Sequence, residues 1–185
     1  MPLMESESDE MVASAVQSGN TEAFGVLVDR YEAKITRYAS KFLYSYDDRL
    51  DAVQEVFLKA YEHIQSFRVT EKFSSWLYRI AHNVFLNIIR KRGREKISFV
   101  DLDVLFPAGI PDEAESRTAF SEEYPHMEKY LSKLEVKYRE VLVLFYFEER
   151  SYEQIAEILQ IPKATVGVRL RRAKIAMKKV VETTI

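Results

Sequence analysis

The side chains with the clearest chemistry in this sequence are arginine and lysine, which gather in two clusters. Residues 86–96 contain five bases and one acid, and residues 161–181 contain seven bases and no acid. Guanidinium and ammonium groups at this density neutralise phosphate, and duplex DNA presents one phosphate charge for about every 1.7 Å of its axis. The clusters predict two surfaces that follow a nucleic-acid backbone, with a merely solvated surface as the alternative for either cluster alone.

The net charge of the whole chain conceals both clusters. Lys and Arg total 27 against 29 Asp and Glu, which gives a net charge of −2. Residues 97–124 supply seven acids and the single base Arg117, so the total is a cancellation between segments of opposite sign. DNA repels such an acidic stretch, which therefore suits a connection between DNA-binding surfaces.

Catalytic chemistry has little support in the sequence. The chain has no cysteine and three histidines, and it lacks a phosphate-cradling glycine loop or a nucleophile motif. The enzyme alternative is a metal-dependent nuclease using His63, His82 and His126, but His63 and His82 do not have close ligand spacing. We expect no enzymatic activity, no catalytic residue, no metal site and no cofactor.

Prolines and charge divide the chain. Pro107, Pro111 and Pro125 fall in or beside the acidic stretch, where no helical period is sustained, whereas apolar residues elsewhere recur at three- and four-residue spacing. We predict an all-α fold of two small helical domains: an acidic tail (1–9), a first domain (10–95), a flexible acidic linker (96–125) and a second domain (126–182). No apolar run reaches about 18 residues, so no membrane insertion is expected.

Capping residues predict three helices at the start of the first domain. Ser8 caps a short helix that stops at Gly19, and Thr21 caps a second helix that runs to about Tyr44. Asp47 or Asp48 starts a third helix. The expected core stripe of this third helix consists of Leu50, Val53, Phe57, Ala60, Tyr61 and Ile64.

The opposite side of the third helix combines carboxylates with an exposed leucine. Its residues share one sector at about 100° per residue. They are Asp51, Gln54, Glu55, Leu58 and Glu62. Such a face suits docking on a partner helix, and a solvated face with one exposed leucine is the alternative.

The segment from Gln65 to Arg92 mixes aromatic, basic and amide side chains and ends in the first basic cluster. Aromatic rings stack on extruded bases with about 1–3 kcal/mol each, while Arg and Lys hold the backbone, so the segment suits single-stranded nucleic acid. The alternative is core packing, because several apolar residues have core spacing. These are Phe73, Leu77, Ile80, Ala81 and Val84.

The second domain contains a helix-turn-helix signature. Ser151 and Gln154 have capping-box spacing, and residues 160–162 break the first helix of the motif. Its core residues are Ile155, Ala156 and Leu159. The second helix has an apolar seam of Val166, Leu170, Ala173 and Met177 and turns Arg171, Arg172, Lys174, Lys178 and Lys179 outward. This architecture suits a DNA major groove, and a pure protein-interaction module is the alternative.

Four blocks in order resemble the extracytoplasmic-function sigma factors of bacterial RNA polymerase, which belong to the sigma-70 superfamily. In the first domain the blocks are Asp51-x-x-Gln54-Glu55-x-Phe57 and Phe73-Ser-Ser-Trp76-Leu-Tyr-Arg79-Ile-Ala-x-Asn83. In the second they are Leu134-x-x-Lys137-Tyr-Arg139-Glu140-Val141, and Ser151-Tyr-x-Gln-Ile-Ala-x-Ile-Leu followed by Thr165-Val-x-x-Arg169-Leu-x-Arg172-Ala173. The resemblance implies sigma region 2 for residues 10–95 and sigma region 4 for residues 126–182.

The resemblance implies an alternative sigma factor that binds core polymerase, recognises the −35 and −10 promoter elements and melts the −10 region. Asp51, Gln54, Glu55 and Leu58 would then dock on the clamp helices of the largest polymerase subunit. The −10 element would be bound by Ser66, Phe67, Arg68, Lys72, Arg79, Asn83, Asn87 and Arg90. Opening costs a few kcal/mol of stacking for each extruded base, so binding must supply this energy.

The −35 element would be read as duplex by the second domain. The residues implied are Lys163, Thr165, Val168, Arg169, Arg171 and Arg172. Gly167 and Val168 stand where relatives commonly have polar or basic residues, and a valine suits contact with a thymine methyl group. Gln160 replaces a glycine that is frequent in the turn of relatives.

The same resemblance implies the remaining partners: the flap region of core polymerase, promoter DNA and an anti-sigma factor that covers the binding faces. We expect a cytoplasmic protein, associated with the nucleoid when active and held at the membrane when an anti-sigma factor binds it. The alternative function is a helix-turn-helix transcription regulator that never serves as a sigma subunit.

Overall fold

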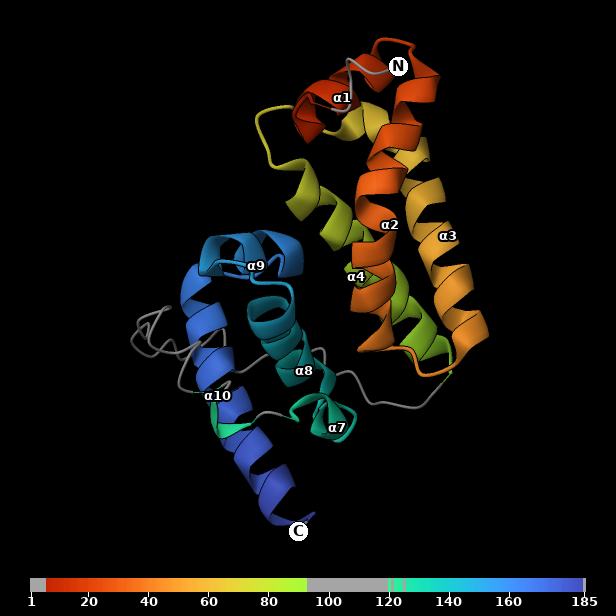
Figure 1. Cartoon of the computed structure of the whole chain (residues 1–185). Coiled ribbons are helices and arrows are strands. Elements are labelled where there is room, and N and C mark those ends of the chain that lie inside the picture. The colour runs from red at the N-terminus through yellow and green to blue at the C-terminus, as the bar shows by residue number, and fades with distance from the viewer. Residues whose placement is uncertain (1–5, 93–119, 121, 125, 185) are drawn as a thin grey trace. The chain divides into compact units, whose positions relative to one another are not determined.

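Figure 1 shows the computed structural model, which describes residues 6–92, 120, 122–124 and 126–184. Within these residues every regular element is helical, so the all-α prediction is confirmed. The chain divides into two compact units, Met1–Ile88 and Ile89–Ile185. Most of the predicted linker (96–125) and residues 1–5 of the predicted tail lie outside the described residues.

The first unit begins with α1 (Asp9–Gln17). Ser8 caps it as predicted, since its side chain accepts a hydrogen bond from the Met11 backbone N–H. The helix stops before Gly19, whose φ of 102° lies in the left-handed region that glycine adopts without steric cost.

The second helix differs from its prediction at both ends. Thr21 does not cap it, because Thr21 lies inside a short 3-10 turn, η1 (Thr21–Ala23), that precedes α2 (Phe24–Ser40). The helix ends before Tyr44 because the chain turns there to bury Phe42 and Leu43 in the core.

The third helix, α3 (Tyr46–Glu62), starts within two residues of the predicted position, but its core stripe is rotated. Leu50 and Tyr61, both predicted to be in the core, are 44% and 42% exposed. The buried residues are Ala52, Val53, Val56 and Ala60. Two of these four are alanines, whose short side chains let α3 lie close to α2, with which it makes extensive contact.

Aromatic side chains join α2 to the last helix of the unit, α4 (Phe73–Lys91), which follows a 3-10 turn, η2 (Ile64–Ser66). The Tyr38 ring centroid lies 5.2 Å from that of Tyr78 and 5.3 Å from that of Phe85. Edge-to-face and tilted ring contacts at this distance add to the area that the rings bury. This core holds α4 against α2 (Figure 1).

The second unit consists of α7 (Glu128–Leu131), α8 (Val136–Leu142), the π-helical turn η3 (Val143–Phe147), α9 (Tyr152–Leu159) and α10 (Lys163–Glu182). The long helix α10 contacts α7, α8 and α9. Its predicted seam of Val166, Leu170, Ala173 and Met177 is buried, as expected.

The helix-turn-helix consists of α9, a turn and α10. The capping box is present, because Ser151 accepts from the Gln154 backbone N–H and the Gln154 side chain accepts from the Ser151 backbone N–H. The core prediction for α9 was partly wrong: Ile155 is buried, but Ala156 and Leu159 are only half-buried. Tyr152 and Ile158 complete the buried side of this short helix.

Candidate nucleic-acid interface

One side of α3 carries the residues predicted to dock on a partner. Asp51, Gln54, Glu55 and Leu58 are all exposed, and their spacing places them on one face of the helix. Leu58 is 59% exposed, and the Lys59 Nζ lies 3.6 Å from the Glu55 Oε1. The structure therefore brings these four residues together on an acidic surface with an apolar centre, which we call the α3 face.

The loop between η2 and α4 carries exposed cations. Arg68 and Lys72 are exposed, and the Glu71 carboxylate lies 3.8 Å from Arg68 and 3.7 Å from Arg79 of α4. Ser66 is exposed, and its hydroxyl donates to the His63 carbonyl. The loop thus presents positive charge and polar groups to a ligand outside the protein.

Phe67 lies in the core and not on the surface. Its side chain is 3% exposed, and its ring centroid is 5.5 Å from both Phe73 and Trp76. Binding of the −10 element through the Phe67 side chain, as the resemblance implies, would require this ring to become exposed. The loop is anchored at this point by ring packing.

The four residues predicted on α4 share one side of the helix. At about 100° per residue, Arg79, Asn83, Asn87 and Arg90 fall within about 80° of one another. Asn83, Asn87 and Arg90 are exposed and Arg79 is half-buried. We call this row the α4 face; its amide and guanidinium groups are donors suited to base edges and phosphates.

The six residues predicted to read duplex DNA fall into two groups in α10. Lys163, Arg171 and Arg172 are at least partly exposed. Thr165, Val168 and Arg169 are buried, and base contact through their side chains would require them to become exposed. The Lys163 ammonium donates to Glu153 of α9, and this hydrogen bond lowers the pKa of the Glu153 carboxyl.

A buried ion pair explains why Arg169 points inward. The Arg169 Nη1 lies 3.8 Å from the Glu140 Oε2, and both side chains are at most 10% exposed. Glu140 belongs to α8, so the pair connects the two helices that make the largest contact in the unit. Removing either partner would leave a buried charge, which is strongly destabilising.

Sequence reasoning missed the role of Arg139, which is fully buried. Its guanidinium donates to three backbone carbonyls, those of Leu131 (2.8 Å), Ser132 (3.2 Å) and Leu134 (3.0 Å). These carbonyls lie at and just after the end of α7, where helical C=O groups lack intrahelical partners. The local sequence carries no signal for this role, because Arg139 lies among other charged residues, Glu135, Lys137 and Glu140.

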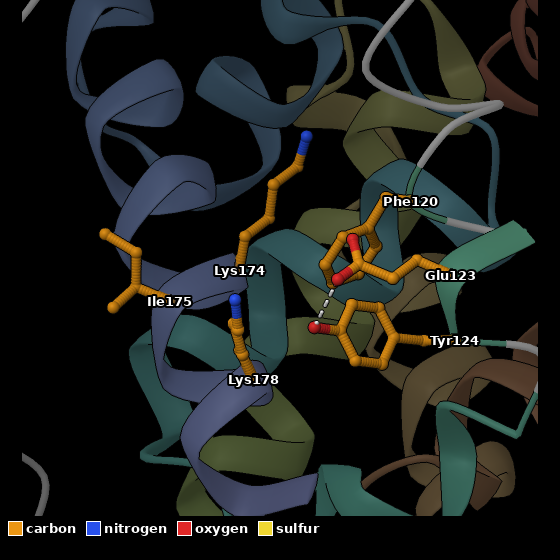
Figure 2. Close-up of a pocket in the computed structure, with 6 residues that line it drawn as sticks. All are labelled: Phe120, Glu123, Tyr124, Lys174, Ile175 and Lys178. Carbon is orange, nitrogen blue, oxygen red and sulfur yellow. Dashed lines mark hydrogen bonds between the residues drawn. The ribbon is translucent and has the colours of Figure 1, made fainter. Parts of the chain in front are cut away.

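A pocket of about 300 Å³ lies beside α10 and is lined by Phe120, Glu123, Tyr124, Lys174, Ile175 and Lys178 (Figure 2). The Phe120 ring stacks on Tyr146 at 4.8 Å, and the Lys174 ammonium lies 5.3 Å from the centroid of the Phe120 ring. Burial lowers the pKa of Lys174, although Glu123 opposes this shift. Lys174 is therefore partly withdrawn from the basic surface on which it was predicted.

The same pocket contains a tyrosine with a shifted pKa. Figure 2 shows the Tyr124 hydroxyl directed at Glu123, to which it donates a hydrogen bond of 2.9 Å. Burial and this bond to a carboxylate raise the pKa of Tyr124 to about 12.

Among the described residues, no group of His, Asp and Glu side chains could hold a metal ion. Of the three histidines, His63 and His126 are exposed and His82 is buried. No helix in the described part of the chain is long and apolar enough to cross a membrane.

Two family models match the chain. Residues 27–95 match the model described as Sigma-70 region 2, and residues 127–177 match the model described as Sigma-70, region 4. The chain is 35% identical over 176 residues to the ECF RNA polymerase sigma factor SigW of Bacillus subtilis (strain 168), with 89% of this chain and 91% of that protein covered.

Solved structures share the fold. CnrH, in a complex with the cytosolic domain of CnrY, aligns with a TM-score of 0.71 at 26% identity, covering 96% of this chain and 99% of that chain. The sigma factor RpoE from Bartonella quintana, in a complex with the anti-sigma factor NepR, aligns with a TM-score of 0.62 at 23% identity, covering 86% and 96%. At this identity the second likeness concerns the fold alone.

Proposed function

This chain belongs to the extracytoplasmic-function (ECF) family of RNA polymerase sigma factors, and from this membership we propose which surface serves each step of transcription initiation. The α3 face binds core polymerase. The 66–72 loop and the α4 face bind the −10 element, and α10 binds the −35 element. In this assignment residues 10–95 act as sigma region 2, residues 126–182 as sigma region 4, and residues 96–125 as the tether between them.

The α3 face is the observation that carries the proposal. A leucine that is 59% exposed among Asp51, Gln54 and Glu55 contributes nothing to the core of the first unit. An exposed apolar side chain within a polar rim matches the anatomy of a protein interface, which has an apolar centre and a polar edge. We assign the α3 face to the clamp helices of the largest polymerase subunit. We also assign the second domain a contact with the flap region of the polymerase.

The −10 assignment rests on the loop and the α4 face. Arg68, Lys72 and Arg79 supply positive charge near the loop, while Asn83 and Asn87 supply amides that can bond to unpaired base edges. Ser66 and Arg90 extend this surface at its two ends. Phe67 anchors the loop to the core, because its ring is packed against Phe73 and Trp76.

The −35 assignment rests on Lys163, Arg171 and Arg172, the three predicted residues that solvent reaches. Thr165, Val168 and Arg169 stay in the proposed set on the family resemblance alone. Phosphate contacts from the exposed bases would set the position of α10 in the major groove.

Two proteins of the same fold were solved with a protein partner: CnrH with the cytosolic domain of CnrY, and the sigma factor RpoE from Bartonella quintana with the anti-sigma factor NepR. We propose that an anti-sigma factor binds this chain as well and withholds it from core polymerase.

The test is reconstituted initiation. Purified chain and core polymerase are mixed with a promoter library, and run-off transcripts are sequenced; we expect initiation from promoters that share one −35 and one −10 element. Glu55→Lys reverses a charge on the α3 face and should abolish both core binding and initiation. Glu32→Lys, an exposed glutamate of α2 outside this face, is the matched control and should retain both.

Failure would take a recognisable form. The wild-type chain would then bind duplex DNA but would neither bind core polymerase nor direct any initiation. That result would instead support a helix-turn-helix regulator that acts without becoming a polymerase subunit.

A further inference from the structure

The first helix, α1, lies before the residues matched by the region 2 family model, yet its side chains form hydrogen bonds with the backbone at both ends of the 66–72 loop. We infer that Gln17 and Glu10 of α1 are positioning residues that hold the loop in the shape that receives the melted strand. The inference rests on the proposed function of this loop in −10 binding.

Gln17 holds the start of the loop. Its Nε2 donates to the Ile64 carbonyl at 2.7 Å and to the Phe67 carbonyl at 2.8 Å. A side-chain amide has two N–H donors, so these two carbonyls use its full donor capacity. The two accepting carbonyls lie at the start of the turn η2 and just after it, so the bonds together fix the backbone on either side of Ser66.

Glu10 holds the end of the loop. Its Oε1 accepts a hydrogen bond of 3.1 Å from the Phe73 backbone N–H, the first residue of α4. The first turn of α4 contains no acidic residue of its own. Glu10 therefore satisfies an N–H group that the helix leaves without an intrahelical partner, and places a carboxylate at the positive end of the helix.

The helix that supplies these side chains is itself fixed to α2. The Asp9 carboxylate accepts from the Arg30 guanidinium at 2.7 Å and from the Tyr31 hydroxyl at 2.5 Å. The base of the loop is closed as well, because the rings of Phe67 and Phe73 meet edge to face at 5.5 Å. Within the loop, Ser66 and residues 68–72 are exposed or half-buried and remain able to contact a ligand.

Preorganisation explains how α1 would act without touching DNA. A loop that is already ordered loses less conformational freedom when the strand binds, so more of the contact energy appears as affinity. Loss of either anchor should weaken capture of the −10 strand and leave the α3 face, and hence core binding, unchanged.

The first experiment compares two isosteric variants in the full-length chain bound to core polymerase. Gln17→Glu removes both donors and adds one negative charge. Gln65→Glu adds the same charge nearby, where the Gln65 Nε2 makes one exposed bond of 3.2 Å to the Gln17 carbonyl. We expect Gln17→Glu to bind a single-stranded −10 oligonucleotide about tenfold more weakly than Gln65→Glu, as for loss of a buried hydrogen-bond partner.

The second experiment separates positioning from simple destabilisation. Glu10→Gln keeps a carbonyl oxygen for the Phe73 N–H and should stay within about threefold of the wild type, whereas Glu10→Ala should lose about tenfold in oligonucleotide affinity. Core affinity should be the same for all four variants, which a partly unfolded first unit would not allow.

The outcomes are distinct. The positioning role is overturned if both pairs of variants show no difference in oligonucleotide affinity. The pairs are Gln17→Glu with Gln65→Glu, and Glu10→Ala with Glu10→Gln. If the wild-type holoenzyme itself does not bind the oligonucleotide, the proposed −10 function of the loop fails instead.

Discussion

Gln160 ends α9 in a left-handed conformation, with φ of 55° and ψ of 45°. For an L-residue this conformation costs about 1–2 kcal/mol because the Cβ crowds the backbone, whereas glycine adopts it freely. Gln160 stands at the position where the resemblance to the sigma factors implies a frequent glycine. The backbone angle supplies the physical reason for that glycine.

We predict that Gln160→Gly stabilises the second unit by about 1 kcal/mol, since it removes the left-handed strain and loses only an exposed side-chain bond to the Glu157 carbonyl. Urea unfolding followed by circular dichroism measures the change. Glu157→Gly, in the middle of α9, is the control and should destabilise by about 1 kcal/mol. A loss of stability in Gln160→Gly would show that its side-chain bond outweighs the strain.

The raised pKa of Tyr124 predicts how the stability of the second unit depends on pH. Its folded pKa of about 12 lies above the ordinary value of 10.0, so the folded state keeps this proton more tightly than the unfolded state. The contribution of the Tyr124 proton to the free energy of unfolding is therefore fully present below pH 10 and is lost as the pH rises from 10 to 12.

Tyr124→Phe removes the titrating group, so its stability should fall less steeply than that of the wild type between pH 10 and 12. Chemical denaturation at a series of pH values measures this difference. Parallel curves for the two proteins over that interval would contradict the raised pKa of Tyr124.

The helix α3 has one side that packs within the first unit and an opposite, exposed side that we propose as a binding surface. Its small buried residues, including Ala52 and Ala60, pack within the unit, while Leu58 is left outside among carboxylates. Because Leu58 has little contact with the core, its truncation should affect binding and not folding.

We predict that Leu58→Ala weakens the affinity for core polymerase by about tenfold or more, the effect of removing an apolar anchor from an interface, while thermal stability stays within about 0.5 kcal/mol. Fluorescence titration of labelled chain with core polymerase measures the affinity. Tyr46→Ala, at the start of α3 and 65% exposed, lies outside the α3 face and should bind normally. Equal losses in both variants would remove the special role of the α3 face.

For the whole molecule, the distribution of charge matters more than its sum. A net charge of −2 would suggest weak attraction to DNA, yet each unit carries exposed arginines on its proposed DNA surface, Arg68 in the first and Arg171 in the second. Contacts to phosphate release counterions, so each should appear in the salt dependence of binding.

The expected slopes distinguish the two units. In the holoenzyme, Arg171→Ala should reduce the slope of log affinity against log salt by about 0.9 on duplex −35 DNA, and Arg68→Ala by about 0.7 on a single-stranded −10 oligonucleotide. Lys34→Ala, an exposed base of α2 outside both surfaces, should change neither slope. Unchanged slopes in the arginine variants would exclude the proposed phosphate contacts.

The features that the sequence determined by itself depend on neighbours along the chain. The Ser8 cap, the capping box of Ser151 and Gln154, and the seam of α10 follow from bonds and periodicities that span a few residues. The exposure of Leu58 follows from the same helical period. These local rules were sufficient for the helical fold, but not for the burial of every side chain on it.

Only the tertiary structure decided which of several apolar or charged residues face inward. Periodicity predicted Leu50 in the core of α3, whereas the packed structure leaves Leu50 44% exposed and buries Ala52. The burial of Phe67, and the bonds of Gln17 and Glu10 to segments 47 to 63 residues away, arise from contacts between distant parts of the chain. No local pattern encodes such contacts, because they exist only once the helices have packed.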